Sequence, residues 1–96
     1  MRKGYTDGPF GQIHWRMMDA VAEATMPDLY CLHPSPFSGL AYTNVMPMLA
    51  QNRRVIAPDY PGYGGSDPFK AHPSISEYAE AMLAVIDDLT RGGTVD

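Results

Sequence analysis

Three histidines, one cysteine and a glycine-rich loop are the features of this 96-residue chain that could carry metal or cofactor chemistry. His14, His33 and His72 lie far apart in the sequence, and Cys31 is the single thiol. No HxxxH, HExxH or paired Cys/His spacing brings them together as metal ligands. We therefore expect no metal and no other cofactor, and interpret Cys31 as a small buried apolar residue.

The glycine-rich loop contains Gly62-Tyr63-Gly64-Gly65, which invites a phosphate-binding interpretation. The dinucleotide fingerprint would need a third glycine where Asp67 stands. A P-loop would need a Lys followed by Ser or Thr, and the loop has no such pair. The glycines are therefore interpreted as turn residues.

A β-hairpin is predicted at the start of the chain. Residues 2–6 form its first arm, an Asp-Gly-Pro turn follows, and residues 11–18 alternate apolar and polar side chains. Ile13, Trp15 and Met17 would share one face of the second arm.

Two short buried strands are predicted next, at residues 29–32 and 54–58. Continuous apolar runs of this kind are typical of parallel strands covered on both faces. Residues 38–50 between them are predicted to be one helix, kinked at Pro47 because proline has no backbone donor. The apolar side of this helix is expected to contain Leu40, Ala41, Val45, Met48 and Leu49.

The last helix is predicted over residues 75–89. Ser74 and Glu77 have the spacing of a capping box, and Gly92-Gly93 is a helix stop. Thr94-Val95 is expected to begin a further strand. The apolar positions at helical spacing are Ile75, Tyr78, Ala79, Met82, Ile86 and Leu89.

A β-hairpin followed by strand, helix, strand and helix indicates an α/β fold with a parallel sheet that is incomplete. The motifs in it, His33-Pro34-Ser35-Pro36 and the run from Asp59 to Asp67, resemble the HGxP and DxPGxGxSD motifs of α/β-hydrolases. The resemblance extends from about residue 9 to the end. It implies one partial domain over residues 1–96, the amino-terminal third of an α/β-hydrolase, truncated before the nucleophile elbow.

The resemblance also implies which catalytic residues are missing. The family's nucleophile occupies a G-x-S-x-G turn, but Ser66 has Gly64 before it and Pro68 after it. The other serines lack both glycines, and Asp59, Asp67 and Cys31 fail the same test. The acid and the histidine of the triad follow the nucleophile in the family. We therefore expect the isolated chain to be inactive.

The catalytic element that the resemblance leaves in the chain is half of an oxyanion hole. Aligned to HGxP, its donor is the backbone N–H of Ser35, the only N–H between His33 and Phe37 because prolines have none. The family usually has glycine where this chain has Pro34, so a plain structural loop stays open as the alternative. Phe37 could line a substrate pocket, and His33 is interpreted as a brace of the loop.

The implied function is that of a hydrolase acting on a small organic substrate, such as an ester or epoxide, by nucleophilic catalysis in a full-length parent. Seven Lys and Arg against 11 Asp and Glu, without a basic run, argue against nucleic-acid binding. No apolar stretch is long enough for a membrane span or signal peptide, so we expect a cytoplasmic protein. The alternative is a non-enzymatic fragment or binding module that associates through the exposed edge of the strand at 29–32.

Overall fold

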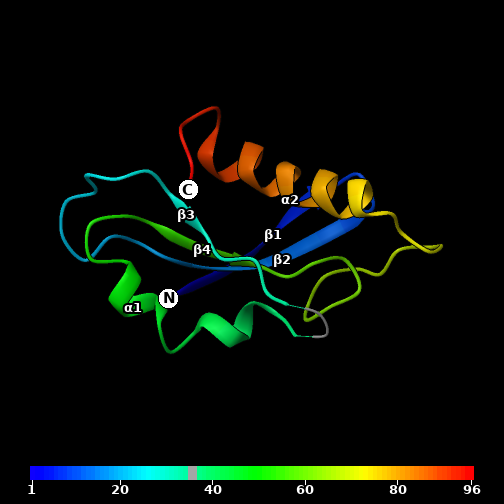
Figure 1. Ribbon diagram of the computed structural model, residues 1–96, viewed down its shortest axis with the longest axis horizontal. Coiled ribbons are helices and arrows are strands. Elements are labelled where there is room, and N and C mark those ends of the chain that lie inside the picture. Colours follow the sequence, from blue (N-terminus) through cyan, green and yellow to red (C-terminus); the bar gives the residue numbers. More distant parts are fainter. Residues whose placement is uncertain (35–36) are drawn as a thin grey trace.

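A computed structural model describes residues 1–34 and 37–96, which form a four-stranded mixed sheet with helices on both faces (Figure 1). The order of the strands in the sheet is β1-β2-β4-β3. This confirms the predicted α/β class and the predicted hairpin. The elements are β1 (Arg2–Gly8), β2 (Gly11–Met18), β3 (Leu29–Tyr30), η1 (Gly39–Tyr42), α1 (Met46–Leu49), β4 (Val55–Pro58) and α2 (Ile75–Thr90).

The antiparallel pair of β1 and β2 carries the alternation predicted from the sequence. Ile13 and Met17 are buried on the inner face of β2, and Trp15 between them is half-buried. Trp15 lies flat over Gly4, where an added Cβ would stand 2.6 Å from its ring. Because Gly4 has no side chain, the ring of the single tryptophan can pack against β1 at this position.

The parallel strands β3 and β4 continue the sheet beside the hairpin, with β4 next to β2 and β3 next to β4. All four residues of β4 are buried, as predicted. β3 is shorter than the predicted strand at 29–32, although the Cys31 N–H still donates to the carbonyl of Ile56 (2.8 Å). The predicted burial on both faces is wrong for most of this run, since Leu29 and Tyr30 are half-buried, Cys31 is buried and Leu32 is 44% exposed. The ladder stops here because the chain turns away toward the prolines.

The prediction of one helix over residues 38–50 with a kink at Pro47 is wrong. The segment forms the 3-10 helix η1 and, separately, the single turn α1. Pro47 lies in the first turn of α1, where its missing N–H costs nothing. A helix continuing through it from η1 would lose a hydrogen bond and clash with the preceding turn, so a new helix begins instead.

The predicted apolar side of this segment is also wrong. The residues that face the sheet are Gly39, Met46 and Ala50. A Cβ at Gly39 would lie 2.5 Å from the carbonyl oxygen of Ala57, so η1 approaches β4 through its smallest residue. The larger side chains are left exposed: Leu40, Val45, Met48 and Leu49.

Helix α2 begins and ends close to the prediction, but its buried face is rotated. Ala81, Met82 and Val85 are buried and pack with Ile13 on the face of the sheet opposite α1 (Figure 1). Ile75, which was expected on the buried side, is 88% exposed. The small side chain of Ala81 lets the helix lie close to the hairpin, and this packing leaves an apolar flank of α2 uncovered.

No helix in the described part of the chain is long and apolar enough to cross a membrane.

The last residues begin the strand predicted at Thr94-Val95. Val95 forms a parallel bridge with Asp28, the N–H of Tyr30 donates to the carbonyl of Asp96 (3.0 Å), and the N–H of Asp96 donates to the carbonyl of Asp28 (2.9 Å). The expected free edge along residues 29–32 is therefore already paired as far as Tyr30.

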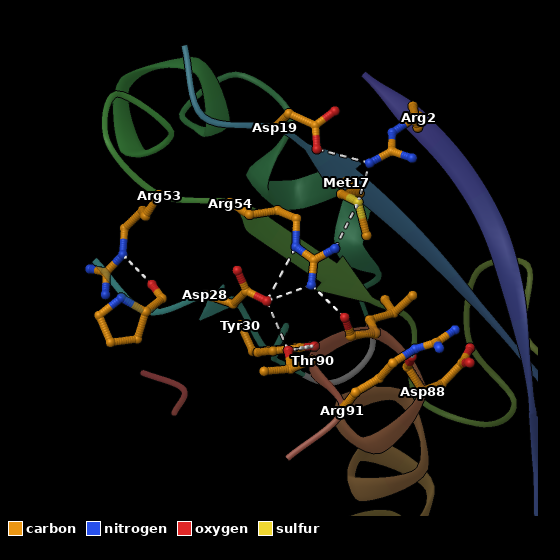
Figure 2. A network of polar contacts seen from close by, with 12 residues as sticks. Arg2, Met17, Asp19, Asp28, Tyr30, Arg53, Arg54, Asp88, Thr90 and Arg91 are labelled. Atoms are coloured by element: carbon orange, nitrogen blue, oxygen red, sulfur yellow. Dashed lines mark hydrogen bonds and ion pairs between the residues drawn. The ribbon is translucent and has the colours of Figure 1, made fainter. Parts of the chain in front are cut away.

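A network of polar contacts connects the carboxyl end of α2 to the residues that precede β3 and β4 (Figure 2). One Arg54 Nη donates to the Asp28 carboxylate (2.5 Å) and to the carbonyl of Leu89 (2.5 Å). The Thr90 hydroxyl donates to the same carboxylate (2.9 Å) and lies 2.6 Å from the hydroxyl of Tyr30. The hydrogen bond that Arg54 donates to Asp28 raises the pKa of Arg54. Its positive charge complements the dipole of the helix terminus beside it.

The capping box at the start of α2 is confirmed and yields a stability prediction. The Glu77 N–H donates to the Ser74 hydroxyl (3.2 Å), and the Ser74 N–H donates to the Glu77 carboxylate (3.0 Å). We expect Ser74→Ala to lower the free energy of unfolding by about 0.5–2 kcal/mol. Ser76→Ala, an exposed position in the same turn without a capping bond, is the matched control. Equal losses in thermal unfolding of the full-length parent would contradict the assignment of the cap.

Candidate functional site

The candidate site lies at the carboxyl ends of β3 and β4. The connection from β3 to β4 carries α1 on one face of the sheet, whereas the connection from β4 to Val95 carries α2 on the other (Figure 1). The strand order therefore reverses beside β3. In open α/β sheets the crevice outside such a reversal is where ligands bind. The two motif loops, residues 33–38 and 59–67, both start at this edge.

The Asp59 side chain connects these two loops through hydrogen bonds. Asp59 directly follows β4 and its side chain is fully buried. One carboxylate oxygen, Oδ1, accepts the N–H of Gly39 (2.6 Å), and the other, Oδ2, accepts the N–H of Gly65 (3.0 Å). His14 Nδ1 lies 2.9 Å from Oδ2 and Arg16 Nη1 lies 3.5 Å from Oδ1. Charge-assisted hydrogen bonds of this kind offset the cost of burying the carboxylate.

The proton between His14 and Asp59 can be placed by chemistry. An ionised carboxylate only accepts hydrogen bonds, so Nδ1 of His14 carries the hydrogen and donates it. The imidazole is itself buried, and its centroid lies 5.2 Å from that of the Tyr5 ring in an edge-on arrangement. Arg16 supplies the compensating charge, although its buried Nη1 has no hydrogen-bond partner in the described part of the chain.

The glycine-rich loop is strapped to β2 by its own polar groups. The Ser66 hydroxyl donates to the carbonyl of Asp59 (2.8 Å) and accepts the N–H of His14 (2.9 Å). Asp67 and Gln12 exchange two further bonds of 2.9 Å each, N–H of Asp67 to carbonyl and N–H of Gln12 to carboxylate.

Several backbone N–H groups of the same loop donate to acceptors within residues 59–67. The N–H of Gly62 goes to the carbonyl of Asp67 (3.0 Å), that of Gly65 to Asp59 and that of Ser66 to the carbonyl of Tyr63 (3.0 Å). These donors are not directed at a phosphate. The geometry agrees with the interpretation of the glycines as turn residues.

His33 is buried and holds its loop through both ring nitrogens. Nε2 accepts the N–H of Tyr60 (3.0 Å), so Nδ1 carries the proton and donates to the carbonyl of Pro34 (3.0 Å). The rings of Tyr60 and Tyr63 lie 4.5 and 5.5 Å from the imidazole. This arrangement fits the predicted brace, because neither nitrogen is left to exchange a proton with a substrate.

Ser35, the predicted oxyanion donor, lies outside the described residues. Its neighbour Phe37 is described: the N–H of Phe37 donates to the carbonyl of Pro34 (2.8 Å), and its side chain is 59% exposed. Phe37 lines a shallow hollow of about 540 Å³ together with Ser38, Leu40, Ala41, Asn44 and Gly64. The hollow thus has one wall from each motif loop.

An apolar groove of about 530 Å³ lies on the other face, between α2 and the start of the glycine-rich loop. It is lined by Leu32, Tyr60, Tyr63, Ile75, Tyr78, Ala79, Met82, Leu83 and Ile86. Burial raises the pKa of the Tyr60 hydroxyl, so it is neutral at physiological pH. On the side of the sheet the groove is lined by Leu32 and Tyr60, which follow the carboxyl ends of β3 and β4.

Solved structures with the same arrangement are enzymes. The N-acyl homoserine lactonase AidH matches with a TM-score of 0.79 and 26% identity over 99% of this chain. The haloalkane dehalogenase DatA from Agrobacterium tumefaciens matches with a TM-score of 0.76 and 22% identity over 93%. A thermophilic esterase from Thermogutta terrifontis matches with a TM-score of 0.74 and 20% identity over 99%. The chain has the α/β-hydrolase fold.

The α/β-hydrolase match is confined to part of those enzymes. The chain covers 35% of the lactonase, 29% of the dehalogenase and 35% of the esterase. It spans about a third of their length, in line with the predicted partial sheet. No protein-family model matches the chain, and no curated protein does.

The role of Asp59 and His14 was missed by the sequence analysis. Asp59 was weighed there only as a nucleophile, and His14 only as a metal ligand. The available signal was an aspartate directly after a buried strand, followed by glycines whose N–H groups can reach back to it. Their pairing depends on β2 lying beside β4, which the spacing of the residues does not show.

Among the described residues no group of three or more His, Cys, Asp or Glu side chains could hold a metal ion.

Gly64 provides a test of the geometry around Asp59. Its φ is +51°, and a Cβ there would stand 2.2 Å from Oδ2 of Asp59. We expect Gly64→Ala to lower the free energy of unfolding by about 1–3 kcal/mol more than Gly92→Ala, since the methyl group must displace the carboxylate. Gly92 is the matched control because its φ is +82° and nothing lies within 4 Å. Equal losses in urea denaturation of the full-length parent would show that the carboxylate is not confined.

Proposed function

We propose that this chain is the amino-terminal segment of an α/β-hydrolase that acts on a small organic substrate, such as an ester or epoxide, by nucleophilic catalysis. The observation that supports this most is the meeting of both motif loops at the carboxyl ends of β3 and β4, where the strand order reverses. Matched structures include an esterase, an epoxide hydrolase and a dehalogenase.

The position of the missing nucleophile follows from the sheet. In the family it stands on the G-x-S-x-G turn after the next strand, and Val95 already pairs beside β3. A nucleophile at the carboxyl end of that strand would face the loop at residues 33–38. It would attack the electrophilic carbon of the substrate while negative charge grows on a substrate oxygen.

In this proposal the Ser35 N–H donates to that oxygen. The flanking prolines have no N–H, and the N–H of Phe37 is already given to Pro34. A donor aimed at developing charge lowers the barrier because it needs no reorganisation during the reaction. The exposed ring of Phe37 would then contact the apolar part of the substrate in the hollow.

We propose in addition that the 96 residues alone do not catalyse the reaction and instead associate with one another. Two features favour association: the outer side of Val95 and Asp96 is a sheet edge, and the apolar groove along α2 exposes Leu83 (55%) and Leu32. This retains the non-enzymatic binding module as the second candidate function, now with the groove as its surface.

The oxyanion assignment predicts the effect of Ser35→Pro. If the reading frame continues after codon 96 to a G-x-S-x-G elbow, the protein expressed from it should hydrolyse p-nitrophenyl esters or epoxides. Ser35→Pro removes the donor and should lower kcat about 10²–10³-fold. Ser35→Ala, which keeps the backbone N–H and alters only the side chain, is the matched control. An unchanged kcat in Ser35→Pro would place the donor elsewhere, and a frame without an elbow would overturn the hydrolase proposal.

The proposed association predicts the behaviour of the isolated chain. Size-exclusion chromatography with light scattering should show oligomers or aggregates, with no ester turnover above an equal mass of albumin. Leu83→Glu should shift the chain toward monomer because it charges the groove. Leu40→Glu, which charges an exposed residue on the opposite face, should not. A monomer peak for the unaltered chain with a cooperative thermal transition would contradict the proposal.

A further inference from the structure

We propose that Asp59 is a positioning residue that sets the two walls of the Phe37 hollow relative to each other, and that the His14 N–H holds it in place. The meaning of the hollow as the substrate side rests on the proposed function. The positioning itself rests on the contacts of the described residues.

Each carboxylate oxygen of Asp59 serves a different wall. Oδ1 accepts the N–H of Gly39, the first residue of η1, which directly follows Phe37 and Ser38. Oδ2 accepts the N–H of Gly65, next to Gly64 on the opposite wall. The two walls thus share one carboxylate, so a movement of the carboxylate moves both.

His14 fixes the carboxylate to the rigid hairpin. Its Nδ1–H donates to Oδ2, the oxygen that also serves Gly65. The groups facing the imidazole are the Asp59 carboxylate, the Tyr5 ring from β1 and the backbone of Gly65, with Arg16 beyond the carboxylate at Oδ1. Loss of this donor should therefore loosen the Gly65 wall first, because the Gly39 wall depends on Oδ1.

A pair of variants separates hydrogen bonding from filling of space. His14→Phe keeps an aromatic ring but removes the donor. His14→Asn loses ring volume but places an amide N–H near the position of Nδ1. Packing alone would make the Phe variant the milder one, whereas positioning by the donor would make the Asn variant the milder one.

Asp59→Asn supplies the second test. The amide has one acceptor oxygen and one NH₂ group, so it can accept the N–H of Gly39 or that of Gly65 but not both. One wall should be released while the other is kept. Asp67→Asn, which also alters a carboxylate that accepts a backbone N–H, is the matched control outside the hollow.

The experiment is hydrogen–deuterium exchange with mass spectrometry on the 96-residue chain, which reads oligomers as well as monomers. Peptides covering residues 37–42 and 62–66 report the two walls, and a peptide from α2 reports the fold. We expect His14→Phe to speed exchange at residues 62–66 roughly 10- to 100-fold, because this variant loses one charge-assisted hydrogen bond. His14→Asn should stay within a few-fold of the unaltered chain, and Asp59→Asn should speed exchange of one wall peptide only.

Three results would overturn the proposal: His14→Phe milder than His14→Asn, equal release of both walls in Asp59→Asn, or loss of α2 protection in every variant. The last would make Asp59 a general determinant of folding. None of these results bears on ester or epoxide hydrolysis. A failure of the hydrolase proposal would equally leave the exchange pattern unchanged.

Discussion

The site depends on one constraint, which is that a fully buried carboxylate must be given hydrogen-bond donors. Asp59 obtains them from Gly39, Gly65 and His14, so three segments that are distant in sequence meet at one point. The glycine at position 64 follows from the same constraint, since any side chain there would occupy the space of the carboxylate. Two glycines of this motif, Gly64 and Gly65, are therefore explained by the buried carboxylate.

Elements that depend on local chemistry were predictable from the sequence. The hairpin and the start of α2 follow from alternation, a turn and a capping box, and each was found close to its expected bounds. The segment at 38–50 was not predictable in this way. Its break and its buried face are decided by the close approach of Gly39 to Ala57, which is a tertiary contact. The buried face of α2 differs from the predicted one for the same reason. The small Ala81 packs against the sheet, whereas the larger Ile75 is exposed.

The candidate site divides along the same line. The two motif loops were found from residue types in order. His33 was interpreted as a brace from the family resemblance, and its bonds to Pro34 and Tyr60 agree with that interpretation. The bond between His14 and Asp59 spans 45 residues and two elements. Only the antiparallel pairing of β2 with β4 brings these residues together, and a strand pairing of this kind leaves no spacing signal in a single sequence.

The burial of Cys31 gives the chain a built-in chemical reporter. The thiol lies in the apolar cluster with Met46, Val55 and Ala57, and burial raises its pKa, which lowers the fraction of reactive thiolate. Its N–H is also the last bond that joins the first parallel strand to β4. Only 9% of Cys31 is exposed, so opening of this corner of the sheet would increase the access of an alkylating reagent to the sulfur. The rate of its modification should therefore rise when the strand leading into the His33 loop detaches from its neighbour.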